Sequence, residues 1–290
     1  MTFTSTYGYR PKKKKKLIAP KQVTPKEITV VIPVKDNQKG IDNFLKALIK
    51  THRTQEYPRQ IIIIDDRSKS TEILDKYHKE LDILLLHSDK RGPAAARNIG
   101  WKKAKTNWIL FTDSDCIPRK NWINGYNASL DGSIGYAGNV KAYGNDYLSQ
   151  YYESQNILIP APYTLFGIEY PEFLVTANAL VWKPALREIN GFNEEIYIAA
   201  GEDVDLGFRL REIGELRYAL ESIINHNFDD GLEGFKKRFY RYGQGNKRIS
   251  EIYNIDLTPQ PFKPKIKTPG NVELASIQHK YITKGYKKGL

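Results

Sequence analysis

The sequence predicts an α/β fold built around a largely parallel β-sheet. Runs of β-branched residues at positions 28–34 and 61–64 indicate buried strands, and apolar residues between such runs recur at helical spacing. Strands that alternate with helices at this pitch form right-handed parallel units. Such sheets bind ligands at the carboxyl ends of their strands, so the residues that follow each strand are the first candidates for a site.

Each predicted strand and helix has its own signal in the sequence, either an apolar run or a helix-capping residue. Strands are expected at residues 28–34, 61–64, 83–86 and 108–111. A first helix follows Gly40, a second is capped by Ser70, and a third runs through residues 94–105 with Pro93 at its start. Beyond residue 115 the pattern loosens into an aromatic stretch, and an amphipathic helix is expected after Gly231.

Composition narrows the class of protein. The chain has 45 Lys+Arg against 33 Asp+Glu, a formal net charge of +12, which favours an anionic partner such as a phosphorylated ligand, an acidic lipid surface or nucleic acid. One cysteine, Cys116, excludes an intrachain disulfide and suits a reducing cytosol. No apolar run approaches the roughly 20 residues of a membrane span, and residues 1–16 lack the core of a signal peptide. We therefore expect a cytoplasmic protein.

The N-terminal residues 1–26 carry the lysine run Lys12–Lys16, several prolines and few bulky apolar residues. This composition predicts a flexible basic arm. Such an arm could contact anionic lipids at the inner face of a membrane, or RNA. It could equally be a solvated tail, and we expect it to be dispensable for chemistry.

A pair of acids follows the fourth strand. Alternation in an extended segment turns Asp113 and Asp115 to the same side. Two hard oxygen ligands suit Mg²⁺ or Mn²⁺, which would keep other positions for water and diphosphate oxygens. The sequence therefore predicts a divalent metal site here, with a pair of solvated loop acids as the alternative.

Other strand ends carry polar residues too. Asp65 and Asp66 follow the second strand, where a carboxylate could accept a hydrogen bond from a uracil imide or a ribose hydroxyl, or could form a turn. Small residues precede Arg97 at a helix start, where backbone can approach an anion closely. Arg97 could instead pair with a neighbouring acid.

A cluster of acids opens a later helix at residues 202–205. One or two acids in a first turn are explained by the helix dipole, but Glu202, Asp203 and Asp205 exceed that need. A carboxylate here could act as a general base that takes a proton from an acceptor hydroxyl.

Two classes of function, a nucleotidyltransferase and a nucleic-acid-binding module, each fit part of this pattern. A nucleotidyltransferase also uses strand-end acids and a metal, but it normally has a glycine-rich loop after the first strand, where this chain has Pro33 and Val34. A nucleic-acid-binding module would exploit the net charge. Acids at the ligand-binding ends of the strands would repel phosphates there, so no nucleic acid is expected at this site.

Five segments together resemble family 2 of the glycosyltransferases. They lie in family order over residues 28–245: Val-Val-Ile-Pro-Val at 30–34, Ile-Ile-Asp-Asp-Arg-Ser at 63–68, Ala-Ala-Arg-Asn-Ile-Gly at 95–100, Phe-Thr-Asp-Ser-Asp at 111–115 and Gly-Glu-Asp-Val-Asp-Leu at 201–206. The resemblance implies a GT-A fold, a Rossmann-like mixed sheet flanked by helices with a C-terminal helical extension. It also implies an inverting hexosyltransferase that uses Mn²⁺ or Mg²⁺ and a nucleotide-sugar donor, by family habit a UDP-sugar.

The resemblance implies a role for each matching residue. Asp203 looks like the catalytic base, and Glu202 would orient a saccharide or lipid-linked acceptor. His226 lies where such enzymes often place a late metal or diphosphate ligand. The remaining implied assignments are the nucleotide-binding residues Pro33, Val34, Asp36, Asp66, Arg97 and Asp113, the metal ligands Asp115 and Asp113, and the diphosphate or acceptor candidates Arg238, Arg241 and Asn178.

By the same resemblance, the GT-A domain occupies residues 27–230, with a nucleotide-binding half at 27–115 and an acceptor-binding half at 116–230. Residues 231–290 form the helical extension and tail. Lys35 and Arg67 depart from the commoner family pattern. The chain also lacks the Gln-x-x-Arg-Trp motif and membrane helices of the processive synthases, which implies that it adds one sugar at a time.

Overall fold

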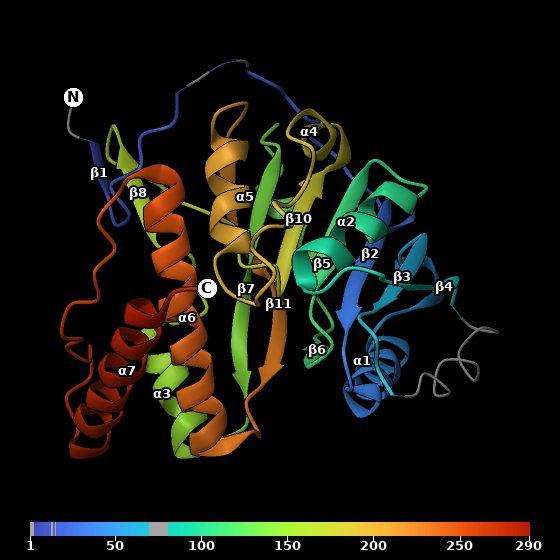
Figure 1. The fold of residues 1–290 in the computed structure, drawn as a ribbon. Coiled ribbons are helices and arrows are strands. Elements are labelled where there is room, and N and C mark those ends of the chain that lie inside the picture. Colours follow the sequence, from blue (N-terminus) through green and yellow to red (C-terminus); the bar gives the residue numbers. More distant parts are fainter. Residues whose placement is uncertain (1–2, 13, 15, 70–80) are drawn as a thin grey trace.

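In a computed structural model of the chain, residues 3–12, 14, 16–69 and 81–290 are described. An eight-stranded mixed sheet runs through the centre in the order β4-β3-β2-β5-β10-β7-β11-β6 (Figure 1). A three-stranded sheet, β1-β8-β9, accompanies it. None of the helices in the described part of the chain has both the length and the apolar character needed to cross a bilayer.

The four parallel strands predicted from the sequence are present. They are β2 (Ile28–Val34), β3 (Gln60–Asp65), β4 (Ile83–His87) and β5 (Trp108–Thr112). The predicted helices beside them are α1 (Gln38–Thr51) and α2 (Pro93–Lys103), and α2 packs on β2 and β3. The helix expected to be capped by Ser70 lies outside the described residues. The confirmed elements bring the ends of β2, β3 and β5 to one edge.

The chain beyond residue 115 is more regular than its sequence pattern indicates. It forms β6 (Cys116–Pro118), β7 (Gly135–Tyr143), β10 (Asn178–Trp182) and β11 (Leu216–Asn227). Strand β10 runs antiparallel between β5 and β7, and β11 runs parallel to β7. The apolar alternation within these segments is weak. They form strands because they pair with neighbouring strands that are distant in the sequence.

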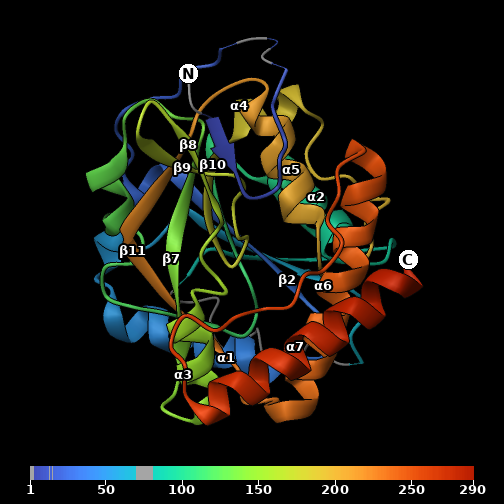
Figure 2. The same cartoon turned by 90° about the vertical axis from the view of Figure 1, so that its left-hand side faces the viewer.

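Shorter elements and the helices complete the fold. They are β1 (Phe3–Ser5), β8 (Pro162–Leu165), β9 (Ile168–Pro171), the 3-10 turns Pro25–Glu27, Thr54–Glu56 and Asn124–Ser129, and the helices α3 (Tyr147–Gln155), α4 (Lys183–Glu188), α5 (Glu202–Arg211), α6 (Gly231–Tyr253) and α7 (Pro269–Lys288). Helices α6 and α7 lie side by side in both views (Figures 1 and 2). The expected amphipathic helix after Gly231 is α6.

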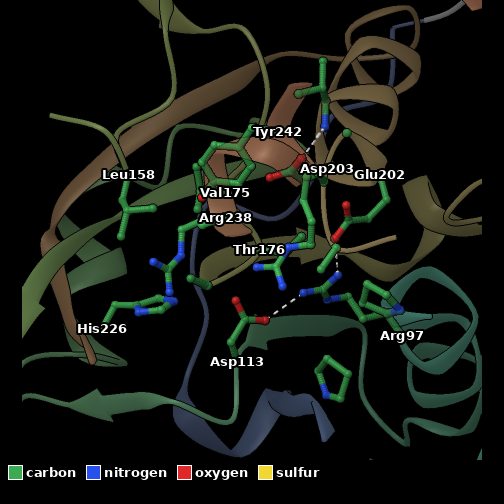
Figure 3. Close-up of a pocket in the computed structure, with 18 of the residues that line it drawn as sticks. Arg97, Asp113, Leu158, Val175, Thr176, Glu202, Asp203, His226, Arg238 and Tyr242 are labelled. Carbon is green, nitrogen blue, oxygen red and sulfur yellow. Dashed lines mark hydrogen bonds and ion pairs between the residues drawn. The ribbon is translucent and has the colours of Figure 1, made fainter. Parts of the chain in front are cut away.

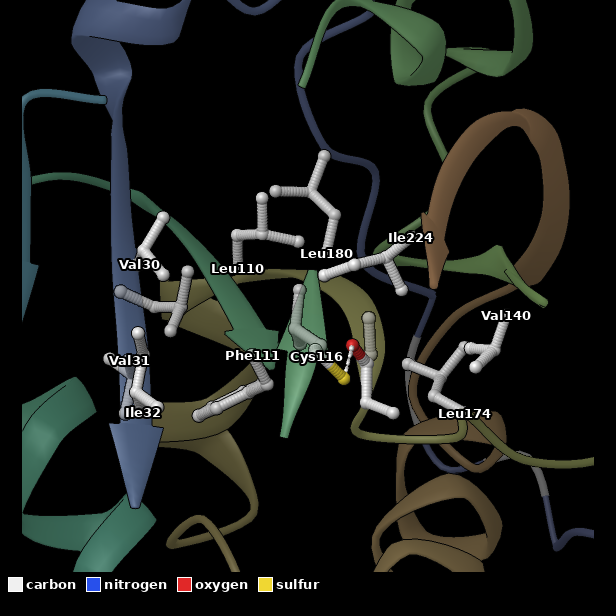
Figure 4. Close-up of a cluster of buried hydrophobic side chains, with 14 of the residues drawn as sticks. Val30, Val31, Ile32, Leu110, Phe111, Cys116, Val140, Leu174, Leu180 and Ile224 are labelled. Carbon is white, nitrogen blue, oxygen red and sulfur yellow. Dashed lines mark hydrogen bonds between the residues drawn. The ribbon is translucent and has the colours of Figure 1, made fainter. Parts of the chain in front are cut away.

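The main core lies on the sheet and spans both of its halves. Fully buried side chains of β2 and β5 meet those of β10 and β11 (Figure 4). Examples are Val31, Phe111, Leu180 and Ile224, each 0% exposed. The two halves share one hydrophobic core, so the strand ends keep a fixed spacing on which a site can be built.

The N-terminal segment differs from the expected flexible arm. Strand β1 pairs antiparallel with β8, and Ala19 and Val23 are buried in the main core. The backbone nitrogens of Lys14 and Leu17 donate to carbonyls of Glu212 and Ile213, at 2.9 and 2.6 Å. Strand pairing and apolar anchors hold the described part of this segment against the domain, despite its lysines and prolines.

Candidate active site

A cavity of about 540 Å³ lies where the ends of β2 and β5 face α5 and α6. Figure 3 shows acids and arginines converging on it from the end of β5 and from α2, α5 and α6. Predicted site residues on its wall are Pro33, Val34, Asp66, Arg97, Asp113, Asp115, Glu202, Asp203, His226, Arg238 and Arg241. Segments as far apart in the sequence as Pro33 and Arg241 therefore meet in one site.

Arg97 links the two halves of the cavity. Its guanidinium donates to Asp113 Oδ1 at 2.7 Å and to Glu202 Oε1 at 2.9 Å (Figure 3). Burial acts to lower the pKa of Arg97, but Asp113 and Glu202 outweigh it and the pKa is raised. Arg97 therefore pairs with neighbouring acids, which is one of the two interpretations open from the sequence. These contacts fix the positions of both carboxylates.

The end of β3 presents one acid to the cavity and uses the other in a turn. Asp66 is 7% exposed and its Oδ2 accepts a hydrogen bond from the Gly92 backbone nitrogen at 3.1 Å. Asp65 instead accepts from the Ser68 nitrogen at 3.0 Å. Of this pair, Asp66 is the one that lines the cavity, and its Oδ1 also pairs with Arg67 Nη2 at 2.9 Å.

Asp36 has a local structural contact. Its Oδ1 accepts from the Lys69 backbone nitrogen at 3.0 Å, and its own nitrogen donates to Ser68 Oγ at 2.8 Å. Its φ of 50° bends the chain directly after β2. Asp36 is not among the described residues that line the cavity, and it joins the loops after β2 and β3.

A group with metal-ligand chemistry lies just beyond the same end of β5, two residues after Asp113. Potential ligand atoms of Asp115, Cys116 and His226 all lie within 4.8 Å of one another. The register that pairs His226 with Cys116 across β11 and β6 brings the imidazole beside Asp115. Cys116 is 0% exposed and its Sγ lies 3.8 Å from the Ala177 carbonyl. Burial raises the pKa of this thiol, so it is a poor ligand for a hard cation.

Asp115 and His226 fit a divalent cation. His226 Nε2 lies 3.5 Å from Asp115 Oδ1, close to the roughly 3 Å between adjacent ligands of a six-coordinate Mg²⁺. The other imidazole nitrogen, Nδ1, is 3.1 Å from the Asn227 carbonyl. A donation from Nδ1 to that carbonyl leaves the Nε2 lone pair directed to the metal position. The Asp115 side chain is 40% exposed and faces the cavity.

The first turn of α5 brings two acids to the cavity. Glu202 is 4% exposed, and its Oε2 has no hydrogen-bond partner within the described residues. Asp203 Oδ1 accepts from the Val204 backbone nitrogen at 2.9 Å. Burial, with a further contribution from Glu202, raises the pKa of Asp203 to about 8. A carboxyl with such a pKa is suited to accept a proton near neutral pH.

The third acid of this helix has a structural role. Asp205 is 1% exposed, and its Oδ2 accepts from Arg209 Nε at 2.9 Å. Its Oδ1 accepts from the Tyr253 hydroxyl at 2.8 Å. Because both oxygens are used and the residue is not among the described residues of the cavity wall, Asp205 holds α5 against α6.

The two arginines of α6 that line the cavity differ in how many partners their side chains have. Arg238 donates to the Tyr152 hydroxyl at 2.8 Å and to Asp230 Oδ2 at 2.9 Å, and its guanidinium lies 4.9 Å from the centre of the Phe228 ring. Arg241 lines the cavity without a hydrogen bond or ion pair to any other described residue. Arg241 is therefore the cation more readily available to an anionic ligand.

Asn178 does not have the predicted role in ligand contact. It is 0% exposed, and its Oδ1 accepts from Trp122 Nε1 and the Tyr126 hydroxyl, each at 2.8 Å. Its Nδ2 donates to the Ser222 carbonyl at 2.9 Å. The amide's hydrogen-bonding capacity is used inside the fold, so it supports the sheet instead of contacting diphosphate or acceptor.

Two tyrosines of the cavity wall are not among the residues that the sequence predicts for the site. Tyr242 lies beside Asp203 (Figure 3), and Tyr7 reaches the cavity from the N-terminal segment. Tyr242 belongs to the segment Arg-Tyr-Gly-Gln-Gly at 241–245, whose arginine alone was singled out. For Tyr7 no local signal exists, because only the pairing of β1 with β8 brings it there.

Comparison with known protein families gives one match over half of the chain. Residues 29–175 match the family described as glycosyl transferase family 2. A pre-mycofactocin glycosyltransferase of Mycobacterium tuberculosis is 29% identical over 233 residues, which are 74% of this chain and 46% of the relative. The chain thus spans about half the length of that relative.

Solved structures show the same fold. Fragment 1–349 of Staphylococcus aureus TarS in complex with UDP-GlcNAc matches with a TM-score of 0.56 at 17% identity, over 91% of this chain and 73% of the fragment. A Pyrobaculum calidifontis mannosyltransferase in complex with GDP-Man and Mn²⁺ also has a TM-score of 0.56, at 14% identity over 96% of this chain and 77% of that chain. The mixed sheet and its helices are therefore of the GT-A type.

Proposed function

Because the chain belongs to glycosyl transferase family 2, we propose that it transfers one sugar from a UDP-sugar to a hydroxyl acceptor, with a divalent metal and inversion at the sugar carbon. One observation carries this proposal. A single cavity contains a candidate metal pair, Asp115 and His226, and a carboxyl of raised pKa, Asp203. Family membership gives no support to a nucleotidyltransferase or a nucleic-acid-binding module.

The ends of β2 and β3 are the proposed nucleotide side. Pro33 and Val34 give an apolar surface for a base, and Asp66 gives a buried acceptor for the uracil imide or the ribose hydroxyls. The similar structures hold different nucleotide sugars, UDP-GlcNAc in one and GDP-Man in the other, so the proposal of a uracil base depends on Asp66. Asp113, held by Arg97, is proposed to contact the ribose or a water molecule on the metal.

Asp115 and His226 are the proposed protein ligands of Mn²⁺ or Mg²⁺. A cation bound there would neutralise negative charge on the departing diphosphate. Arg241 is proposed to contact the same diphosphate from α6, since it lines the cavity and has no partner within the described residues. Arg238, tied to Tyr152 and Asp230, is proposed to position this wall and add positive charge.

Asp203 is the proposed general base. The acceptor hydroxyl gives its proton to the Asp203 carboxylate while its oxygen forms the bond to the sugar carbon, and the bond to the diphosphate breaks on the opposite side. A single displacement of this kind inverts the anomeric configuration. Glu202, held by Arg97, has a second oxygen without a partner in the described chain, which supports a role in orienting the acceptor.

The acceptor is proposed to be a saccharide or a lipid-linked saccharide. Basic residues at the N-terminus support peripheral contact with an anionic membrane from the cytoplasmic side. Of the run Lys12–Lys16, the structure describes Lys12, Lys14 and Lys16, and Lys14 pairs with Glu212 at 2.7 Å while 69% of its side chain is exposed. Vesicles with and without phosphatidylserine test this contact, and binding that is independent of anionic lipid would contradict it.

A donor screen tests the proposed reaction. The full chain, with Mn²⁺, is incubated with UDP-, GDP- and dTDP-sugars and a panel of saccharide acceptors, and nucleotide release and product mass are measured. We expect acceptor-dependent release of UDP and an adduct heavier by one sugar. Preference for GDP- or dTDP-sugars would reject the donor assignment, and products extended by many sugars would reject single transfer.

A further inference from the structure

The N-terminal segment contributes a side chain to the cavity. Tyr7 lines it together with Asp203 and Tyr242, although it lies at the opposite end of the sequence. Strand β1, which pairs with β8 from Phe3 to Ser5, brings the segment to this place (Figure 2). The cavity wall thus includes a part of the chain outside the residues that match the family.

A buried carboxylate fixes the segment beside the cavity. Glu172 is 0% exposed, and it accepts hydrogen bonds from Ser5 Oγ at 2.9 Å, from the Thr6 backbone nitrogen and from the Tyr7 backbone nitrogen at 3.2 Å. A carboxylate is costly to bury unless hydrogen bonds satisfy it. Glu172 therefore needs this segment in place, and the segment places Tyr7.

Two tyrosines of the segment have contrasting surroundings. The Tyr7 ring packs edge-on against Phe173 and Phe208, with centroid distances of 5.6 and 5.8 Å. Its hydroxyl has no hydrogen-bond partner in the described chain. Tyr9 stacks on Phe208 at 4.2 Å, and its hydroxyl donates to Glu212 at 2.9 Å. Tyr9 is not among the described residues of the wall and provides a matched control.

Apolar residues share the cavity wall with Tyr7, among them Phe173, Val175 and Val204. The Tyr7 ring packs on Phe208 of α5, the helix whose first turn carries Asp203. Burial raises the pKa of Tyr7, and Asp203 raises it further, so the phenol stays protonated and lies near the proposed base. A tyrosine there offers an apolar ring face to the C–H groups of a sugar and a hydroxyl to one of its oxygens.

We propose that Tyr7 is an acceptor-binding residue, which orients a saccharide hydroxyl toward Asp203. This inference rests on the proposed function and extends it, since it places the N-terminal segment in the active site. The earlier expectation that residues 1–26 are dispensable for chemistry is thereby replaced.

The test compares acceptor kinetics with nucleotide binding. The full chain is assayed with a UDP-sugar and a soluble 4-nitrophenyl glycoside acceptor, and UDP affinity is measured by calorimetry. We expect Tyr7→Ala to raise the acceptor KM at least about tenfold and Tyr7→Phe to raise it less, with the Kd for UDP changed less than about twofold. Tyr9→Phe should leave the acceptor KM unchanged.

An unchanged acceptor KM in folded Tyr7→Ala would overturn the inference while the proposed function stands. A wild-type chain that transfers to no acceptor would overturn the proposed function and this inference with it. If Tyr7→Ala does not fold, a second variant, Tyr7→Cys, tests the inference through the reactivity of its thiol. Since the single cysteine, Cys116, is 0% exposed, Tyr7→Cys carries the one accessible thiol. The glycoside should slow its alkylation, and protection by UDP alone would place Tyr7 on the donor side instead.

Discussion

Gly201 lies against Gly245 so closely that a Cβ on Gly201 would be 3.2 Å from the Gly245 Cα. Gly201 is the N-cap of α5 with a φ of 89°, and Gly245 lies within α6. Glycine alone combines this conformation with this approach of two backbones. The contact brings Asp203 of α5 beside Tyr242 of α6, so two glycines determine the geometry around the proposed base.

The first prediction concerns this contact. A Cβ at Gly245 would lie 2.7 Å from backbone atoms of Ala200, so Gly245→Ala must separate α5 from α6. We expect a loss of about 1–3 kcal/mol in the free energy of unfolding and a lower kcat. Gly270→Ala is the control, because nothing lies within 4 Å of its Cβ. Urea unfolding and initial rates measure both, and wild-type behaviour of Gly245→Ala would contradict the packing argument.

The second prediction concerns Arg97. Arg97→Met leaves buried Glu202 without its cation, and removal of one partner of a buried pair costs about 3–5 kcal/mol. The ion pair of Arg217 with Asp131, at 2.6 Å, is half-exposed and lies outside the cavity. Arg217→Met should cost about 0–1 kcal/mol. Chemical denaturation compares the two, and equal losses would show that Arg97 has no special structural role.

The third prediction is a pH profile of transfer. Asp203 must be ionised to accept a proton, and its pKa is raised to about 8. Below that pH we expect kcat/KM to rise about tenfold per pH unit, and above it to level off. Rates at constant ionic strength from pH 5.5 to 9.5 measure this. A profile flat across this range would exclude a base with that pKa.

The fourth prediction concerns the pH dependence of folding stability that follows from the raised pKa of Asp203. Between the ordinary pKa of 3.8 and about 8, the folded chain binds a proton at Asp203 that the unfolded chain releases. This contribution is fully present below the lower value and is lost as pH rises through the upper one. Asp203→Asn should therefore become more stable relative to wild type as pH rises from 4 to about 8. Thermal unfolding across pH checks the sign, and the opposite trend would contradict it.

The fifth prediction concerns the metal. Asp115→Ala and His226→Ala each remove one proposed ligand, so Mn²⁺-dependent binding of UDP should weaken at least about tenfold. Metal-free binding, measured in chelator, should change little. Calorimetry with and without Mn²⁺ separates the two effects. If wild type binds UDP and transfers sugar equally well in excess chelator, the metal assignment is wrong.

The parallel half of the fold could be predicted because each strand has its own apolar run, β-branched at 28–34 and 61–64. Strand β11 could not, since its pairing with β7 depends on residues far away in the sequence. The same division holds in the site. Asp113, Asp115 and Asp203 belong to short local motifs, whereas Tyr7 reaches the cavity only through β1. Asn178 was predicted as a ligand contact, but its side chain makes hydrogen bonds inside the fold, and these contacts could not be seen in the sequence.

The most direct measurement is transfer by Asp203→Asn compared with its binding of UDP. Asparagine keeps the size and the hydrogen bond from the Val204 nitrogen but accepts no proton. We expect transfer to fall by a factor on the order of 100 to 10,000, while the Kd for UDP with Mn²⁺ stays within about twofold. Asp205→Asn, outside the cavity wall, should lower stability and leave the rate of the folded protein nearly intact. Near-normal transfer by folded Asp203→Asn would contradict the assignment of Asp203 as the base, and with it the proposed mechanism.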